Sequence, residues 1–246
     1  MKPLSISSLT SQFVGLILLF INITATKAED QKRFLFVISA HEYGYYLPEL
    51  VTPYRILREA NIQVDIASPQ GKPGRAAAKN RLNRLDKNYF PLLKEQLLTP
   101  LTLESIKTRS YAGVYFVGGS GPMMDLYKHA QVNRIVTELN QQNKIISADC
   151  HGPVALAAVK LGNGEFFVKG RKMTAKSNAE EGYWAETHYP FLLEDKLKEN
   201  KAFFSAAKPG SPYVVADGNL LTGQNPASAE PLARKIVSLV KNLKKI

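Results

Sequence analysis

Apolar residues in this chain are grouped into short continuous runs, which alternate with segments where apolar positions recur every three or four residues. The runs RFLFVIS (33–39), IQVDIAS (62–68), YAGVYFV (111–117) and IISADC (145–150) have the length of strands that are buried on both faces. A further short strand is expected at GNLLTG (218–223). Because continuous apolar runs are typical of parallel strands covered by helices, the pattern predicts a mainly parallel sheet.

Segments whose apolar residues recur at helical spacing follow several of these runs. Residues 48–60 begin with a proline, which the first turn of a helix tolerates. We also expect helices near residues 100–108 and over residues 152–161. Two further helices, at 130–144 and at the end of the chain, have apolar sides made of Val132, Ile135, Val136 and Leu139, and of Ile236, Leu239, Val240 and Leu243. Strands that alternate with helices indicate βαβ units. We therefore predict one α/β domain of the flavodoxin-like type over residues 29–246, with helices on both faces of the sheet.

The first 28 residues follow a different pattern. Lys2 precedes a polar stretch, the apolar run FVGLILLFINI (13–23) and the sequence TATKA, and no acidic residue occurs before Glu29. These features are typical of a secretory signal peptide. The apolar run has 11 residues, whereas a membrane-spanning helix needs about 20. We predict cleavage near Ala28, export to the periplasm or the medium, and no stable membrane insertion afterwards; an uncleaved membrane anchor is the alternative.

Composition and charge agree with a globular, basic protein. Of the 246 residues, 45% are hydrophobic and 22% are charged, and the net charge is +11. Residues 72–87 contain six lysines or arginines and one aspartate. A basic stripe can bind phosphates or anionic lipid. However, no aromatic residues interleave with these charges and no nucleic-acid-binding motif is visible, so we expect a solvated surface insertion and no nucleic-acid partner.

Two features that are candidates for catalysis or ligand binding fall at one edge of the predicted sheet. Cys150, the only cysteine, ends one strand, and the glycines of GGSG (118–121) follow another. Ligands of parallel α/β sheets bind beyond the carboxyl ends of the strands. Taken alone, a cysteine after an apolar strand can also be an inert core residue, because free cysteine is among the most buried residue types.

The sequence ADCHG places Cys150 at a predicted turn from strand to helix. Such a turn lifts a nucleophile clear of the backbone, as it does for the serine of many hydrolases. The start of the following helix favours the thiolate, so this position would act to lower the pKa of Cys150. The amides of Gly119 and His151 are candidates to donate hydrogen bonds to a negatively charged substrate oxygen.

Six motifs together carry a resemblance to a known family. YGYYLPELVTPYRIL, IASPQGKP, VYFVGGSGPMMDL, ADCHGPVAL, NAEE and LLTGQNPAS occur in an order that resembles the PfpI-like superfamily, also called class I glutamine amidotransferase-like. The resemblance runs from about residue 33 to 240, and it is greatest to the branch of heat-shock chaperones and glyoxalase III enzymes. It implies a homodimer and chemistry without a cofactor.

The resemblance also implies roles for individual residues. Cys150 matches the nucleophile, and His151 matches the histidine that follows it in this branch. Glu49 matches an acid that approaches the sulfur from the first helix. Glu181 matches the third acid of the site, with the adjacent Glu180 as the alternative.

The amides of Gly119 and His151 match the oxyanion site of the family, but the chain also departs from the family's pattern. Ser120 stands where many relatives have histidine, and residues 174–176 read TAK where relatives often have TGF. The basic segment 72–87 replaces a more acidic one. These departures leave the substrate open more than the nucleophile.

Other interpretations of these residues stay open. His151 can bond a backbone carbonyl instead of the thiol, Glu49 can lie on a helix surface, and Glu181 can be solvated. His188 is a further candidate partner for the thiol, although capping or packing of a helix is a simpler role for it.

These residues predict an exported enzyme of the glyoxalase III, or D-lactate dehydratase, type. The Cys150 thiolate would attack the aldehyde of a small reactive carbonyl such as methylglyoxal, and Glu49 would move protons between the two carbons, which yields lactate without glutathione. No metal site is expected, because His41 and His129 have no partner at ligand spacing. The alternatives are a holdase chaperone for unfolded clients, a cysteine peptidase or amidase, and a redox sensor.

Overall fold

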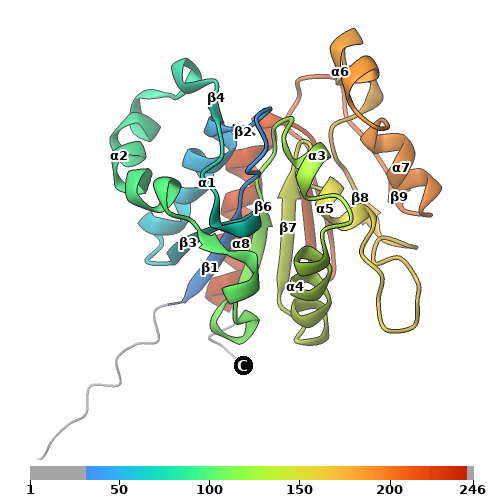
Figure 1. The fold of residues 1–246 in the computed structure, drawn as a ribbon, viewed down its shortest axis with the longest axis horizontal. Helices are drawn as coiled ribbons and strands as arrows, with labels where there is room; N and C mark the ends of the chain where they lie inside the picture. Colours follow the sequence, from blue (N-terminus) through green and yellow to red (C-terminus); the bar gives the residue numbers. More distant parts are fainter. Residues whose placement is uncertain (1–31, 243–246) are drawn as a thin grey trace, which may run out of the picture. The chain divides into compact units, whose positions relative to one another are not determined.

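The computed structural model describes residues 32–242, so the signal peptide predicted for residues 1–28 lies outside the described part of the chain. The main sheet has seven strands in the order β10-β11-β7-β6-β1-β3-β5, and every pair is parallel except β10 with β11 (Figure 1). These strands are β1 (Arg33–Val37), β3 (Gln63–Ser68), β5 (Leu101–Thr102), β6 (Gly113–Phe116), β7 (Ile145–Asp149), β10 (Val214–Asp217) and β11 (Leu220–Gly223). Two small parallel pairs are β2 (Tyr45–Tyr46) with β4 (Ala76–Ala77), and β8 (Lys172–Met173) with β9 (Phe203–Phe204). The predicted mainly parallel sheet is confirmed.

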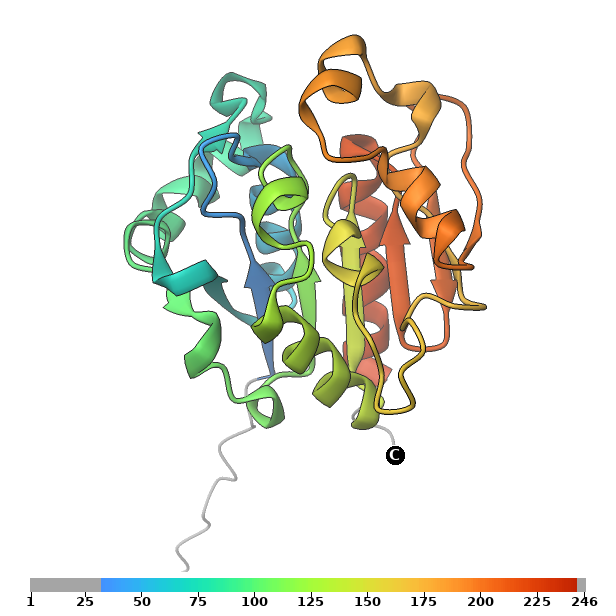
Figure 2. The same cartoon turned by 45° about the vertical axis from the view of Figure 1, so that its right-hand side comes forward.

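Helices cover both faces of this sheet, as predicted. They are α1 (Leu47–Glu59), α2 (Arg84–Leu98), α3 (Pro122–Asp125), α4 (Ala130–Gln141), α5 (Val154–Ala157), α6 (Tyr183–His188), α7 (Leu193–Glu199) and α8 (Ala229–Asn242). The helices α1, α2 and α8 share one core cluster, and α3, α4, α5 and α7 share the other. Figure 2 shows α4 and α8 on opposite sides of the strands, and α6 beyond their carboxyl ends.

The two cores follow from the alternation of side chains along each strand. In β1, Leu35 and Val37 belong to the core with α4, whereas Phe34 and Phe36 belong to the core with α1. The apolar side predicted for α4 is buried as expected, at Val132, Ile135, Val136 and Leu139. In α8, Ile236 and Val240 are buried and Leu239 is half-buried, while Leu243 lies outside the described residues.

Two predicted helices differ from the structure. The helix expected near residues 100–108 is wrong, because β5 and a 3-10 turn (Leu103–Ser105) occupy that stretch; the helix lies earlier, as α2. The helix expected over residues 152–161 ends at Ala157, because the backbone beyond it pairs with residues 165–167: the N–H of Phe167 donates to the carbonyl of Val159. The elements α6, α7, β8, β9 and β10 were not predicted.

The basic segment 72–87 lies on the surface, and its six lysine and arginine side chains are exposed. One acidic residue anchors it. Asp86 is 1% exposed, and its carboxylate accepts hydrogen bonds from Thr52 Oγ1, from Arg55 Nε (2.8 Å) and from Asn83 Nδ2 (2.7 Å). A buried carboxylate is tolerated when it is paired in this way. The contact joins α2 to α1 and leaves the cations of the segment to solvent.

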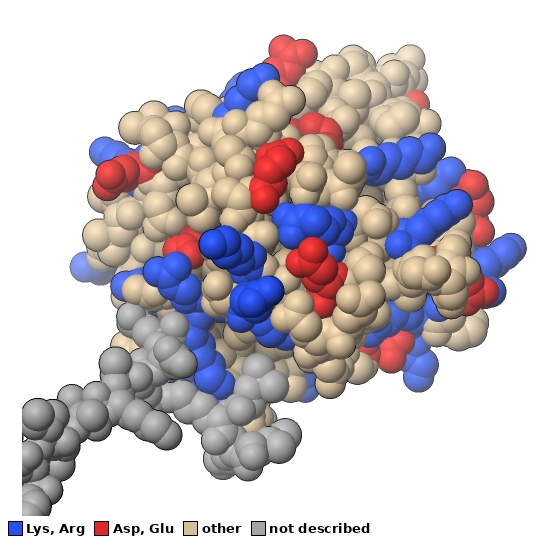
Figure 3. Space-filling view, turned by 60° about the horizontal axis from the view of Figure 1, so that its bottom comes forward, with Lys and Arg blue, Asp and Glu red and all other residues tan. Residues whose placement is uncertain are grey.

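Figure 3 shows the face at the bottom of Figure 1, where lysine and arginine side chains are scattered over the surface with acidic side chains between them. No helix of residues 32–242 is long and apolar enough to span a membrane. The carboxyl ends of the strands lie at the other end, and they carry Cys150 and the glycines of GGSG.

Candidate active site

Cys150 directly follows β7 and has a φ of 52°, in the left-handed region that residues with a side chain rarely adopt. Its N–H donates to the carbonyl of Gly223 at the end of β11 (3.0 Å), and its own carbonyl accepts from the N–H of Lys176 (2.8 Å). The chain then passes through Gly152, where a Cβ atom would lie 2.2 Å from the carbonyl oxygen of Phe116. Neighbouring strands therefore hold Cys150 at a sharp, strained turn, a feature that clusters at functional sites.

Glu49 reaches the same place from the first turn of α1. Its side chain is fully buried. Its carboxylate oxygens accept no hydrogen bond from an N–H or O–H group of the described residues, and the Cys150 thiol is the hydrogen-bonding group that acts on them. Gly118, just after β6, lies between the two groups: a Cβ atom there would be 2.3 Å from Glu49 Oε2 and 2.7 Å from Cys150 Cβ. The absence of a side chain at Gly118 thus leaves the space in which the carboxyl group approaches the cysteine.

Burial governs the protonation of these groups. Burial and the charge of Asp149 raise the pKa of Glu49 well above its ordinary value, and burial and the charge of Glu49 raise the pKa of Cys150. Burial also raises the pKa of Asp149 to about 8. The lowering of the pKa of Cys150 expected from the following helix is therefore wrong, because α5 has only four residues and desolvation outweighs its partial charge. Since the three groups are close together, ionisation of one opposes ionisation of the others.

His151 contacts the thiol on one side and an acid on the other. Its Nδ1 is 3.6 Å from Cys150 Sγ, and its Nε2 is 2.7 Å from Glu181 Oε1. The ring of Tyr189 packs edge-on against the imidazole, with 5.1 Å between ring centroids. A carboxylate on one ring nitrogen orients the imidazole and selects its tautomer. The structure therefore brings Cys150, His151 and Glu181 together in one chain of contacts.

Glu180, the alternative third acid, lies elsewhere. Its carboxylate accepts hydrogen bonds from the N–H of Gly210 (2.8 Å) and from the side-chain amides of Asn225 (2.8 Å) and Gln224 (3.0 Å). These bonds join three separate loops, so the role of Glu180 is to hold those loops together. Glu181, in contrast, contacts His151.

Separate substitutions of the two acids should therefore have different effects. We expect Glu181→Gln to lower turnover on the order of 10²-fold, the low end of what a positioned acid–base group contributes, because His151 loses its orienting charge. We expect Glu180→Gln to lower the melting temperature instead, because hydrogen bonds to a charged group are stronger than those to a neutral one. Steady-state turnover and thermal unfolding of both variants test this pair. Equal losses of turnover in the two variants would contradict the assignment of Glu181.

The two amides expected at an oxyanion site belong to the residues that follow Gly118 and Cys150 in the sequence. Gly119 has a φ of 113°, and a Cβ atom there would lie 2.5 Å from the backbone nitrogen of Tyr46. Neither the N–H of Gly119 nor that of His151 donates a hydrogen bond to another described residue. Both amides are therefore candidate donors to a substrate oxygen.

The remaining histidines have local roles. His188 is exposed, stacks on Trp184 with 4.4 Å between ring centroids, and bonds the backbone of its own helix. His41 and His129 each accept a hydrogen bond through Nδ1 from a backbone N–H two residues later. Within residues 32–242, no group of three or more His, Cys, Asp or Glu residues is arranged to hold a metal ion.

Three residues of the site were missed in the sequence. Asp149 is fully buried, and its Oδ1 accepts from the backbone of the GGSG turn (3.3 Å). Tyr115 donates to the carbonyl of Glu49 (2.9 Å), and Tyr189 donates to Ser120 (2.8 Å). A signal for Asp149 was present, since a carboxylate at the end of an apolar strand is costly without a function. No local pattern marks the tyrosines, because they meet the site only through folding.

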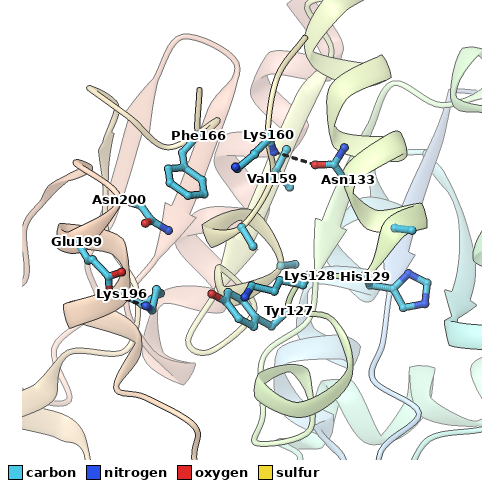
Figure 4. Close-up of a pocket in the computed structure, with 13 residues that line it drawn as sticks. Tyr127, Lys128, His129, Asn133, Val159, Lys160, Phe166, Lys196, Glu199 and Asn200 are labelled. Carbon is cyan, nitrogen blue, oxygen red and sulfur yellow. Dashed lines mark hydrogen bonds and ion pairs between the residues drawn. The ribbon is translucent and has the colours of Figure 1, made fainter. Parts of the chain in front are cut away.

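Figure 4 shows a separate cavity of about 640 Å³ beside α5 and α7. Lys128, Lys160 and Lys196 line it, and each of them packs over an aromatic ring. Lys196 also forms an ion pair with Glu199 (2.5 Å). The lining of this cavity contains no cysteine, serine or threonine next to a base. We therefore place the candidate active site at Cys150.

Comparison with known proteins identifies relatives along most of the chain. A model of the DJ-1/PfpI family matches residues 32–239. The chain is 26% identical over 220 residues to the glutathione-independent glyoxalase hsp3101 of Schizosaccharomyces pombe, covering 82% of this chain and 89% of that protein. The structure resembles the Rapid Encystment Protein of Francisella tularensis, with a TM-score of 0.79, 30% identity and coverage of 84% and 98%. Its fold also matches glyoxalase III from Candida albicans, with a TM-score of 0.77, 21% identity and coverage of 85% and 97%.

Proposed function

This chain belongs to the DJ-1/PfpI family, and we propose that it is a glutathione-independent glyoxalase that converts 2-oxoaldehydes such as methylglyoxal to 2-hydroxy acids. The observation that carries the proposal is the approach of the buried Glu49 carboxyl group to Cys150 across Gly118. A thiol and a proton-carrying carboxyl group are what this conversion requires when no thiol cofactor is supplied. Relatives named as glyoxalases support the same activity.

The first step joins the substrate to the enzyme. The sulfur of Cys150 attacks the aldehyde carbon, C1, and a C–S bond forms. The thiol proton moves to the former aldehyde oxygen, and His151, with Nδ1 3.6 Å from the sulfur, is placed to carry it. The N–H groups of Gly119 and His151 would stabilise the negative charge that develops on this oxygen. The product is a thiohemiacetal.

Glu49 then moves a proton between the two substrate carbons. Its carboxylate removes the proton from C1, which leaves an enediolate, and the resulting carboxyl group returns a proton to C2. The hydroxyl proton of C1 passes to the oxygen on C2, so C1 becomes a thioester. A raised pKa suits this role, because it makes the carboxylate a stronger base for the proton on C1.

Hydrolysis completes the cycle. Water adds to C1 of the thioester, the C–S bond breaks, and the Cys150 thiol regains its proton. For methylglyoxal the net change is the addition of one water molecule, which gives lactate. The experiment is therefore to incubate the dialysed protein with methylglyoxal in the absence of glutathione and to measure lactate by NMR. We expect one lactate per methylglyoxal consumed over many turnovers, and loss of methylglyoxal without lactate would refute the proposal.

A hydrolase is the second candidate, and the chain of contacts from Cys150 through His151 to Glu181 favours it. This arrangement has the composition of a cysteine hydrolase triad. It requires His151 to deprotonate the thiol and then to protonate a leaving amine. Release of amine from peptide or amide substrates, without conversion of methylglyoxal, would select this function.

A holdase is the third candidate, and it rests on exposed leucines of α2. Leu85, Leu92 and Leu98 are 57%, 62% and 70% exposed, and exposed apolar surface of this kind can bind unfolded chains. This function requires no thiol. Export after signal-peptide cleavage and a homodimer stay predictions, which mass analysis of the mature N-terminus and light scattering test.

A further inference from the structure

A cavity of about 440 Å³ lies beside the cysteine site, and two cations without an assigned role line it. Arg81 comes from the basic segment 72–87, and Lys176 comes from the TAK sequence. Tyr46, Glu180 and Asn225 also line the cavity. Two of the three sequence departures that leave the substrate open, the basic segment and the TAK sequence, therefore meet at one place in the fold.

Backbone hydrogen bonds connect two residues of this cavity to the turns that carry Cys150 and Gly118. The N–H of Lys176 donates to the carbonyl of Cys150 (2.8 Å), and the N–H of Tyr46 donates to the carbonyl of Gly118 (2.9 Å). The backbone of two residues of the cavity wall is thus bonded to the backbone of Cys150 and to that of Gly118, the glycine that separates Cys150 from Glu49. Although burial raises the pKa of Cys150, the Lys176 ammonium group acts in the opposite direction, so its charge is felt at the thiol.

The acidic residue of this cavity has hydrogen-bond partners, whereas its two cations are not in direct contact with an acidic side chain. Glu180 is held by hydrogen bonds from Gly210, Asn225 and Gln224. Neither Arg81 nor Lys176 forms an ion pair within 4.0 Å with an acidic side chain of the described residues. The charge of Lys176 does act on the carboxyl groups of Glu180 and Glu49, where it lowers each pKa against the raising effect of burial. Because neither cation is in direct contact with a carboxylate, both can still bind a carboxylate or phosphate group.

We infer that this cavity binds an anionic group of the substrate, so that the protein acts on 2-oxoaldehydes that carry a carboxylate or a phosphate. Arg81 and Lys176 would hold the anionic end, and the aldehyde carbon would lie at Cys150. This inference rests on the proposed function and specifies its substrate class. For 4,5-dioxopentanoate, a carboxylate-bearing example, the conversion adds one water molecule and gives 2-hydroxyglutarate.

The binding of an anion beside the thiol can be tested without any assumption about catalysis. Iodoacetate and iodoacetamide both alkylate a thiol with loss of iodide, and they differ mainly in charge. Because Cys150 is the only cysteine of the chain, each rate reports on one atom. The measurement is the ratio of the two second-order rates, by mass spectrometry, for wild type, Arg81→Gln, Lys176→Gln and the double variant.

We expect the ratio of iodoacetate to iodoacetamide rates to fall about 10-fold in the double variant, in line with the loss of charge-assisted contacts. Lys87→Gln is the matched control, because it removes an exposed cation of the same segment that does not line the cavity; its ratio should equal that of wild type. An equal fall in the control, an unchanged ratio in the double variant, or a thiol that neither reagent reaches would overturn the inference.

A second measurement separates failure of the inference from failure of the proposed function. We expect wild type to have a higher kcat/KM for 4,5-dioxopentanoate than for neutral methylglyoxal, and we expect Arg81→Gln to lower the ratio of the two values about 10-fold through KM. Turnover of methylglyoxal with no preference for the anion would refute the substrate class alone. Turnover of neither compound would refute the glyoxalase, and the alkylation ratios would then decide whether the anion site exists.

Discussion

Replacement of Cys150 by alanine is expected to lower kcat/KM for methylglyoxal by about 10⁴-fold or more, because the reaction then has no sulfur to form the thiohemiacetal. The strained backbone at Cys150, with a φ of 52°, is fixed by neighbouring strands and does not depend on the sulfur. The fold should therefore be retained. Lactate formation by NMR and thermal unfolding of the same preparation measure the two effects independently.

Cys150→Ser serves as a companion variant, because it keeps a small polar side chain but replaces the thiol by a weak nucleophile. We expect it to be nearly as inactive as the alanine variant. Activity within about tenfold of wild type in both variants would show that another group, such as the neighbouring Lys176 amine, attacks the aldehyde. Both variants should keep any ability to suppress aggregation of unfolded clients, since the exposed leucines of α2 are unchanged.

The sheet could be predicted from the sequence because its strands are buried on both faces. Such strands are marked by continuous apolar runs, and all four of the long runs contain a strand of the main sheet. The helix α2 could not be predicted, because its pattern contradicts its environment. Leu85, Leu92 and Leu98 face solvent, Asp86 is buried, and Pro91 lies within the helix. Burial of Leu93 and Leu97 in the core with α1 and α8, together with the contact of Asp86 with Arg55 on α1, explains the position of this helix.

The site was partly predictable for a similar reason. Residues that approach along one sheet edge, such as Cys150 and the GGSG glycines, can be placed from strand ends alone. The choice between Glu180 and Glu181 required the folded loops, because adjacent residues point in different directions. The predicted direction of the Cys150 pKa shift is wrong because burial of the thiol and the charge of Glu49, which both raise this pKa, depend on residues distant in sequence.

The second large effect is expected at Glu49. Glu49→Gln keeps the size of the side chain but cannot carry a proton between C1 and C2, so we expect turnover of methylglyoxal to fall about 10³-fold. The thiohemiacetal should still form, because Cys150 is unchanged, and it should accumulate as a covalent adduct of one methylglyoxal per chain. Native mass spectrometry of the intact protein incubated with methylglyoxal, without a reduction step, detects this adduct. Normal turnover would exclude Glu49 as the proton carrier.

The same substitution should make the protein more stable, and increasingly so as pH rises. Burial raises the pKa of Glu49 above its ordinary value of 4.5 in the folded chain, so the folded chain keeps a proton that the unfolded chain has released. Folding stability in wild type is therefore lost as pH rises from 4.5 through the raised pKa. Glutamine cannot ionise and has no such loss, so the melting temperature of Glu49→Gln should exceed that of wild type at pH 8 and approach it near pH 4. Glu104→Gln removes an exposed acid that forms no ion pair within 4.0 Å among the described residues, so it is the control, and its melting temperature should follow that of wild type at both pH values. A Glu49→Gln variant that is less stable than wild type at pH 8 would mean that the carboxylate supports the fold. A gain in stability together with a loss of turnover would instead identify Glu49 as a residue that is kept for catalysis at the expense of stability.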